Sequence, residues 1–124
     1  MDYVATPSAP AAIGPYSQAV KHHGLVYTSG QIPLDPATGN LVEGDFDVHV
    51  RRVFENLKAV LTEAGTDFSR VLKATVYLAD MANFPILNGI YAEYFGAHKP
   101  ARTTVGVAQL PKGATVEVDL VALA

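Results

Sequence analysis

Two stretches with helical periodicity, each flanked by segments that alternate like strands, constrain the fold of this chain most. The first begins near Asp45 or Asp47 and continues to Ala64, with apolar residues at intervals of three and four. Asp47 is a suitable N-cap for this helix, and Gly65 stands where a left-handed residue ends a helix. The charged residues between the apolar positions are those of an ordinary solvated helix face. The pattern therefore predicts one amphipathic helix of about five turns.

The remaining segments predict a second helix and five strands. The helix covers residues 83–95, with Asn83 as its cap and Gly96 at its end. Alternating apolar residues predict strands at 16–21, 25–29, 71–79, 102–109 and 115–123. In the third strand, Leu72, Ala74, Val76 and Leu78 are expected on one face. The first dozen residues are expected to form an extended arm.

The order of these elements is two strands, a helix, a strand, a helix and two strands. It predicts an α+β fold in which two helices cover one face of a mixed sheet. Residues 1–124 show no low-complexity tract and no boundary, so we expect a single domain. The other sheet face stays uncovered and half apolar, and self-association is the simplest way to bury it.

Composition excludes several classes of function. Charged residues make up 17% and hydrophobic residues 49% of the 124 residues, as in compact globular proteins. The net charge of −3 disfavours nucleic acid as the main partner. The absence of cysteine excludes disulfides and thiolate catalysis, and the four histidines lack metal-ligand spacing, so no metal is expected. Without a signal peptide or a membrane-length apolar run, a cytoplasmic location is expected.

The last two predicted strands carry charges among their core-like residues. We expect these strands, joined by the sequence "LPKGA", to form a hairpin. Alternation then places Arg102 on the same face as Glu117 and Asp119. Two interpretations remain open: a cross-strand ion pair, or an arginine that grips an anion beside a carboxylate able to orient water. Two interpretations also remain open for Asn88: an ordinary residue on the helix surface, or a residue that contacts a ligand.

Four motifs resemble the recurrent blocks of the Rid family, the reactive intermediate deaminases. They are "GPYSQAV", "SGQIP", "LNGIYAEYF" and "PARTTVGVAQLPKGATVEV", in the family's order and at similar spacing from Ile13 to Ala122. The chain departs from the pattern at Thr104, where some active members carry cysteine, and at Val118, where isoleucine or methionine is commoner.

The resemblance implies a fold, an assembly and an activity. Members have a chorismate-mutase-like α+β fold and form homotrimers with active sites in clefts between subunits. The best-known subgroup needs no cofactor and hydrolyses 2-imino acids and their 2-enamine tautomers, such as 2-iminopropanoate and 2-iminobutanoate, to 2-keto acids and ammonia. Two alternatives stay open: a trimeric module that binds a small carboxylate without turnover, and the RNA cleavage attributed to some members, which the acidic balance disfavours.

Residue by residue, the resemblance implies a role for each matching position. Arg102 holds the substrate carboxylate, with help from the backbone N–H of Gly30, and Glu117 positions and activates water. Asp119 is expected to have a structural role. The remaining pocket residues implied by the motifs are Tyr16, Ser29, Asn88 and Thr104.

Overall fold

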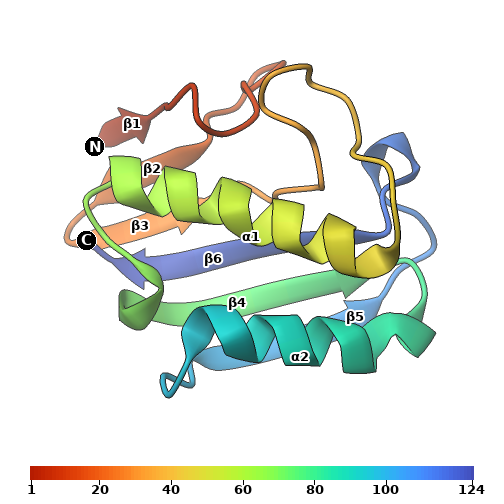
Figure 1. The fold of residues 1–124 in the computed structure, drawn as a ribbon. Helices are drawn as coiled ribbons and strands as arrows, with labels where there is room; N and C mark the ends of the chain where they lie inside the picture. The colour runs from red at the N-terminus through yellow and green to blue at the C-terminus, as the bar shows by residue number, and fades with distance from the viewer.

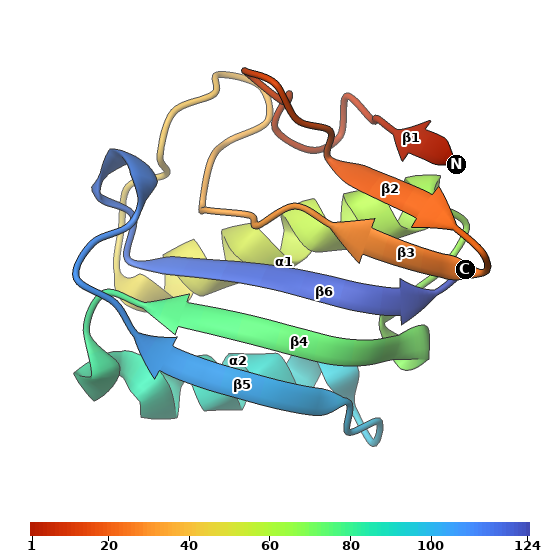
Figure 2. The ribbon, with the colours of Figure 1, turned by 180° about the vertical axis from the view of Figure 1, so that it is seen from behind.

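Six strands form one mixed sheet in the order β1-β2-β3-β6-β4-β5 (Figures 1 and 2). The computed structural model describes all residues, 1–124. Neighbouring strands are antiparallel except β4 and β5, which run parallel. The strands are β1 (Asp2–Val4), β2 (Ala19–His22), β3 (Leu25–Thr28), β4 (Val71–Leu78), β5 (Ala101–Gly106) and β6 (Val116–Leu123).

Two helices, α1 (Phe46–Glu63) and α2 (Phe84–Phe95), lie on one face of the sheet (Figure 1). Seen from behind, the opposite face carries no helix (Figure 2). The prediction of a mixed sheet covered on one face by two helices is therefore confirmed. Three short 3₁₀ turns occupy Phe68–Arg70, Met81–Asn83 and Pro111–Gly113. Neither helix combines the length and the apolar character that crossing a membrane requires.

The core lies between the helices and the covered sheet face. Every second residue of β6, from Val116 to Ala122, is buried there, and the aligned residues of β4 are Ala74, Val76 and Leu78. Phe54 of α1 is fully buried at the centre of an aromatic cluster formed with Phe68, Tyr91, Tyr94 and Phe95. Two amphipathic helices thus bury their apolar stripes against one apolar sheet face.

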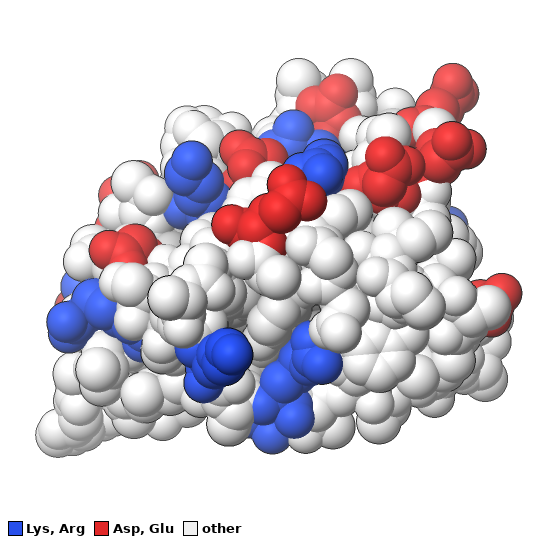
Figure 3. Space-filling view, turned by 60° about the horizontal axis from the view of Figure 1, so that its bottom comes forward, with Lys and Arg blue, Asp and Glu red and all other residues white.

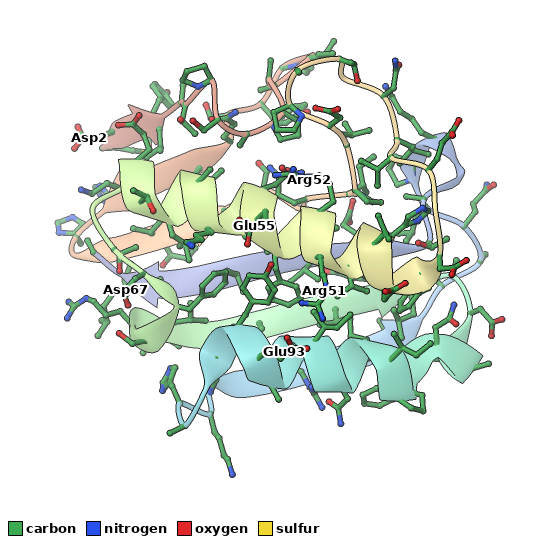
Figure 4. All side chains as sticks on the ribbon, in the orientation of Figure 1. Asp2, Arg51, Arg52, Glu55, Asp67 and Glu93 are labelled. Carbon is green, nitrogen blue, oxygen red and sulfur yellow. The ribbon has the colours of Figure 1, made fainter.

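Polar contacts join the two helices at the surface. Arg51 of α1 and Glu93 of α2 point toward one another and form an ion pair of 3.0 Å (Figure 4). The Tyr94 hydroxyl donates to Glu55 Oε2 at 2.6 Å. Burial and this hydrogen bond raise the pKa of Tyr94 to about 12. Both partners of the ion pair are about half exposed, so the pair adds little to stability.

The prediction that the last two strands form a hairpin is wrong. β5 follows α2 and pairs in parallel with β4 at the edge of the sheet, whereas β6 lies on the other side of β4, next to β3. The connection of residues 107–115 is long enough to pass β4, and a tight hairpin loop is shorter. The more apolar β6 takes the interior position, and the polar β5 takes the edge.

Three local expectations are also corrected. Leu72 is 45% exposed, because a bulge between Val71 and Lys73 turns it away from the buried face. The residue that precedes α1 is Asp45 rather than Asp47, and its side chain makes no capping hydrogen bond. The first dozen residues do not form an unpaired extended arm throughout, because Asp2–Val4 forms a strand that pairs with β2.

We expect Phe54→Ala to lower the free energy of unfolding by about 3–5 kcal/mol, because it removes a fully buried ring from the aromatic cluster. Chemical denaturation followed by circular dichroism measures this loss. Leu72→Ala is the matched control, and its effect should stay within about 0.5 kcal/mol because the side chain is exposed. A large loss of unfolding free energy in Leu72→Ala would show that this side chain is buried, which would contradict the bulge.

Candidate functional site

The predicted site residues lie in two groups on opposite faces of the sheet. On β5, Arg102 pairs with the buried Ala74, so its side chain leaves on the face that carries the helices. On β6, Glu117 pairs with Tyr77, between the buried Val116 and Val118, so it leaves on the open face. The expectation that Arg102 shares a face with the carboxylates is wrong, because β4 separates the two strands and sets the register of each.

The first group, which we call the arginine cluster, consists of Phe84, Asn88, Tyr91, Arg102 and Thr104. The Arg102 guanidinium donates from Nη1 to Asn88 Oδ1 at 2.7 Å. Its central carbon lies 4.7 Å from the centre of the Tyr91 ring and 5.3 Å from that of Phe84. Arg102 forms no ion pair within the chain, and its other N–H groups have no acceptor. The ion-pair interpretation is therefore wrong, and the guanidinium is free to bind an anion.

A cavity of about 440 Å³ opens beside the arginine cluster. Asn88, Tyr91, Lys99 and Arg102 are among the residues that line it. The hydroxyls of Tyr91 and of Thr104 are buried without a hydrogen-bond partner. Unpaired buried hydroxyls are uncommon in folded proteins. Asn88, which the sequence left open, contacts Arg102 and therefore belongs to this group.

The second group, the glutamate cluster, consists of Tyr16, Ser29, Gly30 and Glu117, which line a cavity of about 510 Å³. Gly30 lies directly against Glu117: a Cβ atom at position 30 would be 2.8 Å from the Glu117 carboxyl carbon. The absence of a side chain thus lets the backbone reach the carboxyl group. The N–H of Gly30 donates to no acceptor in the chain, so it is free for a ligand.

Ser29 and Tyr16 shape the edge of this cavity. The Ser29 hydroxyl donates to the carbonyl of Ser17, and its backbone N–H donates to the carbonyl of Gln18. Since its proton is engaged, the Ser29 hydroxyl offers a ligand only acceptor lone pairs. The Tyr16 ring is 54% exposed at the rim and covers the backbone of Gly14.

The buried Gln18 holds one wall of the second cavity. Its side-chain oxygen accepts from the backbone N–H of Thr6 at 2.7 Å, and its amide donates to the carbonyls of Thr6, Ala9 and Pro10. A fully satisfied buried amide of this kind orders the segment that it contacts. The N-terminal segment, which lines the cavity with Pro10 and Ala11, is fixed in this way.

The opposite wall, the connection between β3 and α1, is fixed from two sides. The buried Asn56 donates to the carbonyl of Leu34 at 2.9 Å and accepts from Arg52 at 3.1 Å. Lys112, in a left-handed conformation with φ of 58°, donates to the carbonyl of Gly39 at 3.3 Å. Both cavity walls are therefore tied to the body of the fold.

The open face has an unusual electrostatic environment. Burial, together with the nearby charge of Asp119, raises the pKa of Glu117. Burial also raises the pKa of Asp119, and Tyr77, beside both carboxyls, has a raised pKa for the same reason. A carboxylate with a raised pKa is a stronger base when ionised, which suits a group that accepts a proton from water. No three or more metal-ligating side chains come together anywhere in the chain.

Sequence reasoning missed several residues of these groups. The site residues implied by the motifs include neither Gln18 nor Phe84 and Tyr91, which belong to the apolar side of the second predicted helix. The spacing of Phe84, Asn88 and Tyr91 at i, i+4 and i+7 was a detectable signal, because it puts them on one helix face. Gln18 gave no such signal, since its partners are backbone groups that only the fold brings near.

We expect Glu117→Gln to raise the melting temperature at pH 7. Since the pKa of Glu117 is raised by folding, the folded chain binds a proton there more readily than the unfolded chain. The free energy of unfolding therefore falls as pH rises through the interval between the ordinary and the raised pKa. Glutamine removes this effect, so the variant and the wild type should converge below about pH 4, where the carboxyl is protonated.

Thermal denaturation from about pH 3 to about pH 8 measures this difference. Glu43→Gln, an exposed carboxyl outside both clusters, is the control and should follow the wild type throughout. A Glu117→Gln variant that is less stable than the wild type at pH 7 would show that the carboxylate is favourably paired with a group outside the single chain, which contains no cationic partner for it.

Comparisons with known proteins agree with the motifs. The family model described as Endoribonuclease L-PSP matches residues 6–124. A mouse (Mus musculus) protein named 2-iminobutanoate/2-iminopropanoate deaminase is 47% identical over 120 residues, which cover 97% of this chain and 89% of that protein. Two solved structures share the fold, as follows.

A Yersinia pestis protein of the conserved Rid family has a TM-score of 0.97 at 46% identity, covering 99% of this chain and 98% of that one. The structure of RidA from the Antarctic bacterium Psychrobacter has a TM-score of 0.96 at 42% identity and covers both chains completely. Since the family model spans nearly the whole chain and these relatives match it from end to end, the chain belongs to the Endoribonuclease L-PSP family and, within it, to the Rid proteins.

Proposed function

We propose that this protein is a hydrolytic deaminase of 2-imino acids and their 2-enamine tautomers, such as 2-iminobutanoate, yielding 2-keto acids and ammonia. The observation that carries the proposal is the pair of complementary clusters: a guanidinium with free donors, and a carboxyl group of raised pKa beside a free backbone N–H. The name of the mouse relative agrees with this reaction.

The two clusters belong to one reaction only if they come from different copies of the chain. Arg102 and Glu117 line different cavities and leave the sheet on opposite faces. A contact that joins two different surfaces of identical chains is heterologous, and such contacts form a closed ring when the rotation between subunits returns to its start. Rings of three subunits are what the family resemblance implies. We therefore propose a homotrimer of the chorismate-mutase-like type, in which each active site joins the arginine cluster of one subunit to the glutamate cluster of the next.

The proposed chemistry follows from the residue types. Arg102 binds the substrate carboxylate through two N–H groups, which fixes both the charge and the orientation of the C=N bond. Glu117 accepts a proton from water as the water oxygen forms a bond to C2 of the protonated imine. Glu117 then returns this proton to the nitrogen of the tetrahedral adduct, which becomes an ammonium group. As the C–N bond breaks and ammonia leaves, the Glu117 carboxylate takes the proton of the C2 hydroxyl, and the C2 oxygen becomes the keto group. No cofactor takes part.

Charge on the surface disfavours RNA as the substrate. On the face shown in Figure 3, acidic groups gather over the upper part and basic groups lie scattered, without a continuous basic surface. The net charge of the chain is −3. Nucleic acid binding depends on the neutralisation of successive phosphates by clustered Lys and Arg.

Arg102→Ala should reduce kcat/KM for imine hydrolysis at least about tenfold to a hundredfold, because a charge-assisted hydrogen bond contributes about 1.5–3 kcal/mol. A threonine dehydratase generates the imine, and trapping with semicarbazide measures how much escapes hydrolysis. Arg51→Ala is the matched control, since that arginine joins the two helices at the surface away from either cluster.

The other outcomes of this assay separate the alternatives. If the wild type binds 2-oxobutanoate but does not consume the imine, the protein is a carboxylate-binding module. If it does neither, and binds or cleaves RNA in a way that survives Arg102→Ala, the deaminase proposal is wrong.

Mixed subunits test the proposed division of the site. Arg102→Ala and Glu117→Gln chains should each be nearly inactive alone. Refolded together in equal amounts, they form trimers of which about three quarters are mixed, and each mixed ring holds one intact site among three. We expect about a quarter of the wild-type activity to return. A mixture that stays as inactive as its parents would place both residues in one subunit's site.

A further inference from the structure

Two aromatic side chains, Phe84 and Tyr91, lie against the Arg102 guanidinium, and the proposed reaction assigns them no role. Tyr91 and Phe84 present their rings to the guanidinium at 4.7 and 5.3 Å, both within the range of a cation–π interaction. Asn88, on the same helix face, holds Nη1 at 2.7 Å. One face of α2 thus surrounds the guanidinium with two rings and one amide oxygen.

The Tyr91 ring is itself held by the core. It meets Phe54 edge to face, with ring centres 5.9 Å apart, and packs on Phe95 at 4.4 Å. Only 9% of Tyr91 is exposed. A ring fixed in this way transmits the rigidity of the core to the more exposed arginine, whose long side chain would otherwise sample several rotamers.

The hydroxyl of Tyr91 does not explain why an aromatic residue stands here. It is buried and makes no hydrogen bond. An unpaired buried hydroxyl is unfavourable compared with an apolar group of the same shape. What Tyr91 gives the site is therefore the face of its ring.

We infer that Tyr91, with Phe84, is a positioning residue that holds the Arg102 guanidinium in the orientation that binds the substrate carboxylate. The inference rests on the proposed function for its kinetic consequence, but the geometry of Arg102 can be measured without it. The Nη1 edge is fixed by Asn88 and the planar face by the rings, so the remaining N–H groups are left to grip the carboxylate.

Three variants test this role in the assembled protein. Tyr91→Leu removes the ring, Tyr91→Phe keeps the ring and removes only the hydroxyl, and Phe84→Leu removes the less buried second ring. We expect Tyr91→Leu to raise KM about 2- to 30-fold with a smaller change in kcat, because carboxylate binding is the same in the ground state and the transition state. Tyr91→Phe should restore the wild-type KM and melt at or above the wild-type temperature.

Nuclear magnetic resonance of the Arg102 side chain gives a readout that does not depend on activity. Protons over an aromatic face are shifted upfield, so the Nε–H signal, identified by its loss in Arg102→Lys, should be displaced in the wild type and in Tyr91→Phe. In Tyr91→Leu the signal should move toward the position of a free arginine. Phe84→Leu should give a smaller shift of the same sign, which keeps the test available if Tyr91→Leu fails to fold.

The outcomes are distinguishable. If the wild type shows no imine hydrolysis but the Arg102 signal responds to the ring variants as expected, the proposed function fails and the positioning role stands. If the wild type is active and ring removal changes neither KM nor the Arg102 signal, the positioning role is overturned. A Tyr91→Phe variant as impaired as Tyr91→Leu would also overturn it, because the hydroxyl would then be the active part.

Discussion

The alternation of β6 against β4 is the constraint on which both clusters depend. Val116, Val118, Leu120 and Ala122 pack under the helices, so the residues between them can only face the other way. A shift of the register by one residue would bury Glu117 and Asp119 in the apolar core and expose the valines. The placement of the carboxyls on the open face is thus a direct consequence of core formation.

The alternation of side chains along a strand also determines the position of Arg102, but it places this residue on the face covered by the helices. Its strand, β5, is in register with β4 such that Arg102 shares the helix-covered face with Ala74. A cation is tolerated there because β5 is at the edge of the sheet, where α2 leaves a cavity open to solvent. The rings of α2 and the amide of Asn88 replace part of the hydration that the guanidinium loses.

A division of reactive groups between two faces has a structural consequence for the whole molecule. Arg102 lines one cavity of the single chain and Glu117 lines the other, so neither cavity contains both residues. The open face also exposes Tyr27 and Val105, which are large apolar residues. In the proposed homotrimer, burial of that face and completion of the site are one event. Loss of the assembly would then abolish the proposed activity without any change in the fold of the chain.

The sequence by itself determined both helices, five of the six strands and their order, because hydrophobic periods of 3.6 and 2 residues are local properties of the chain. It located both helices and their terminal glycines, Gly65 and Gly96, and the alternation of β6. The motifs also identified the family, and the seven site residues that they imply stay a prediction. The partners of each strand were not accessible in this way, since a hairpin and a crossover satisfy the same alternation.

Only the tertiary structure decided that Arg102 and Glu117 lie on opposite faces. The physical reason is that α2 returns the chain in parallel to β4, and the long connection 107–115 then carries it across to the far side of that strand. Likewise, the bulge at Leu72 and the backbone partners of Gln18 arise from contacts between distant segments. The local sequence pattern determined which strands and helices carry the site residues. The pairing of strands distant in the sequence determined which of these residues lie close together.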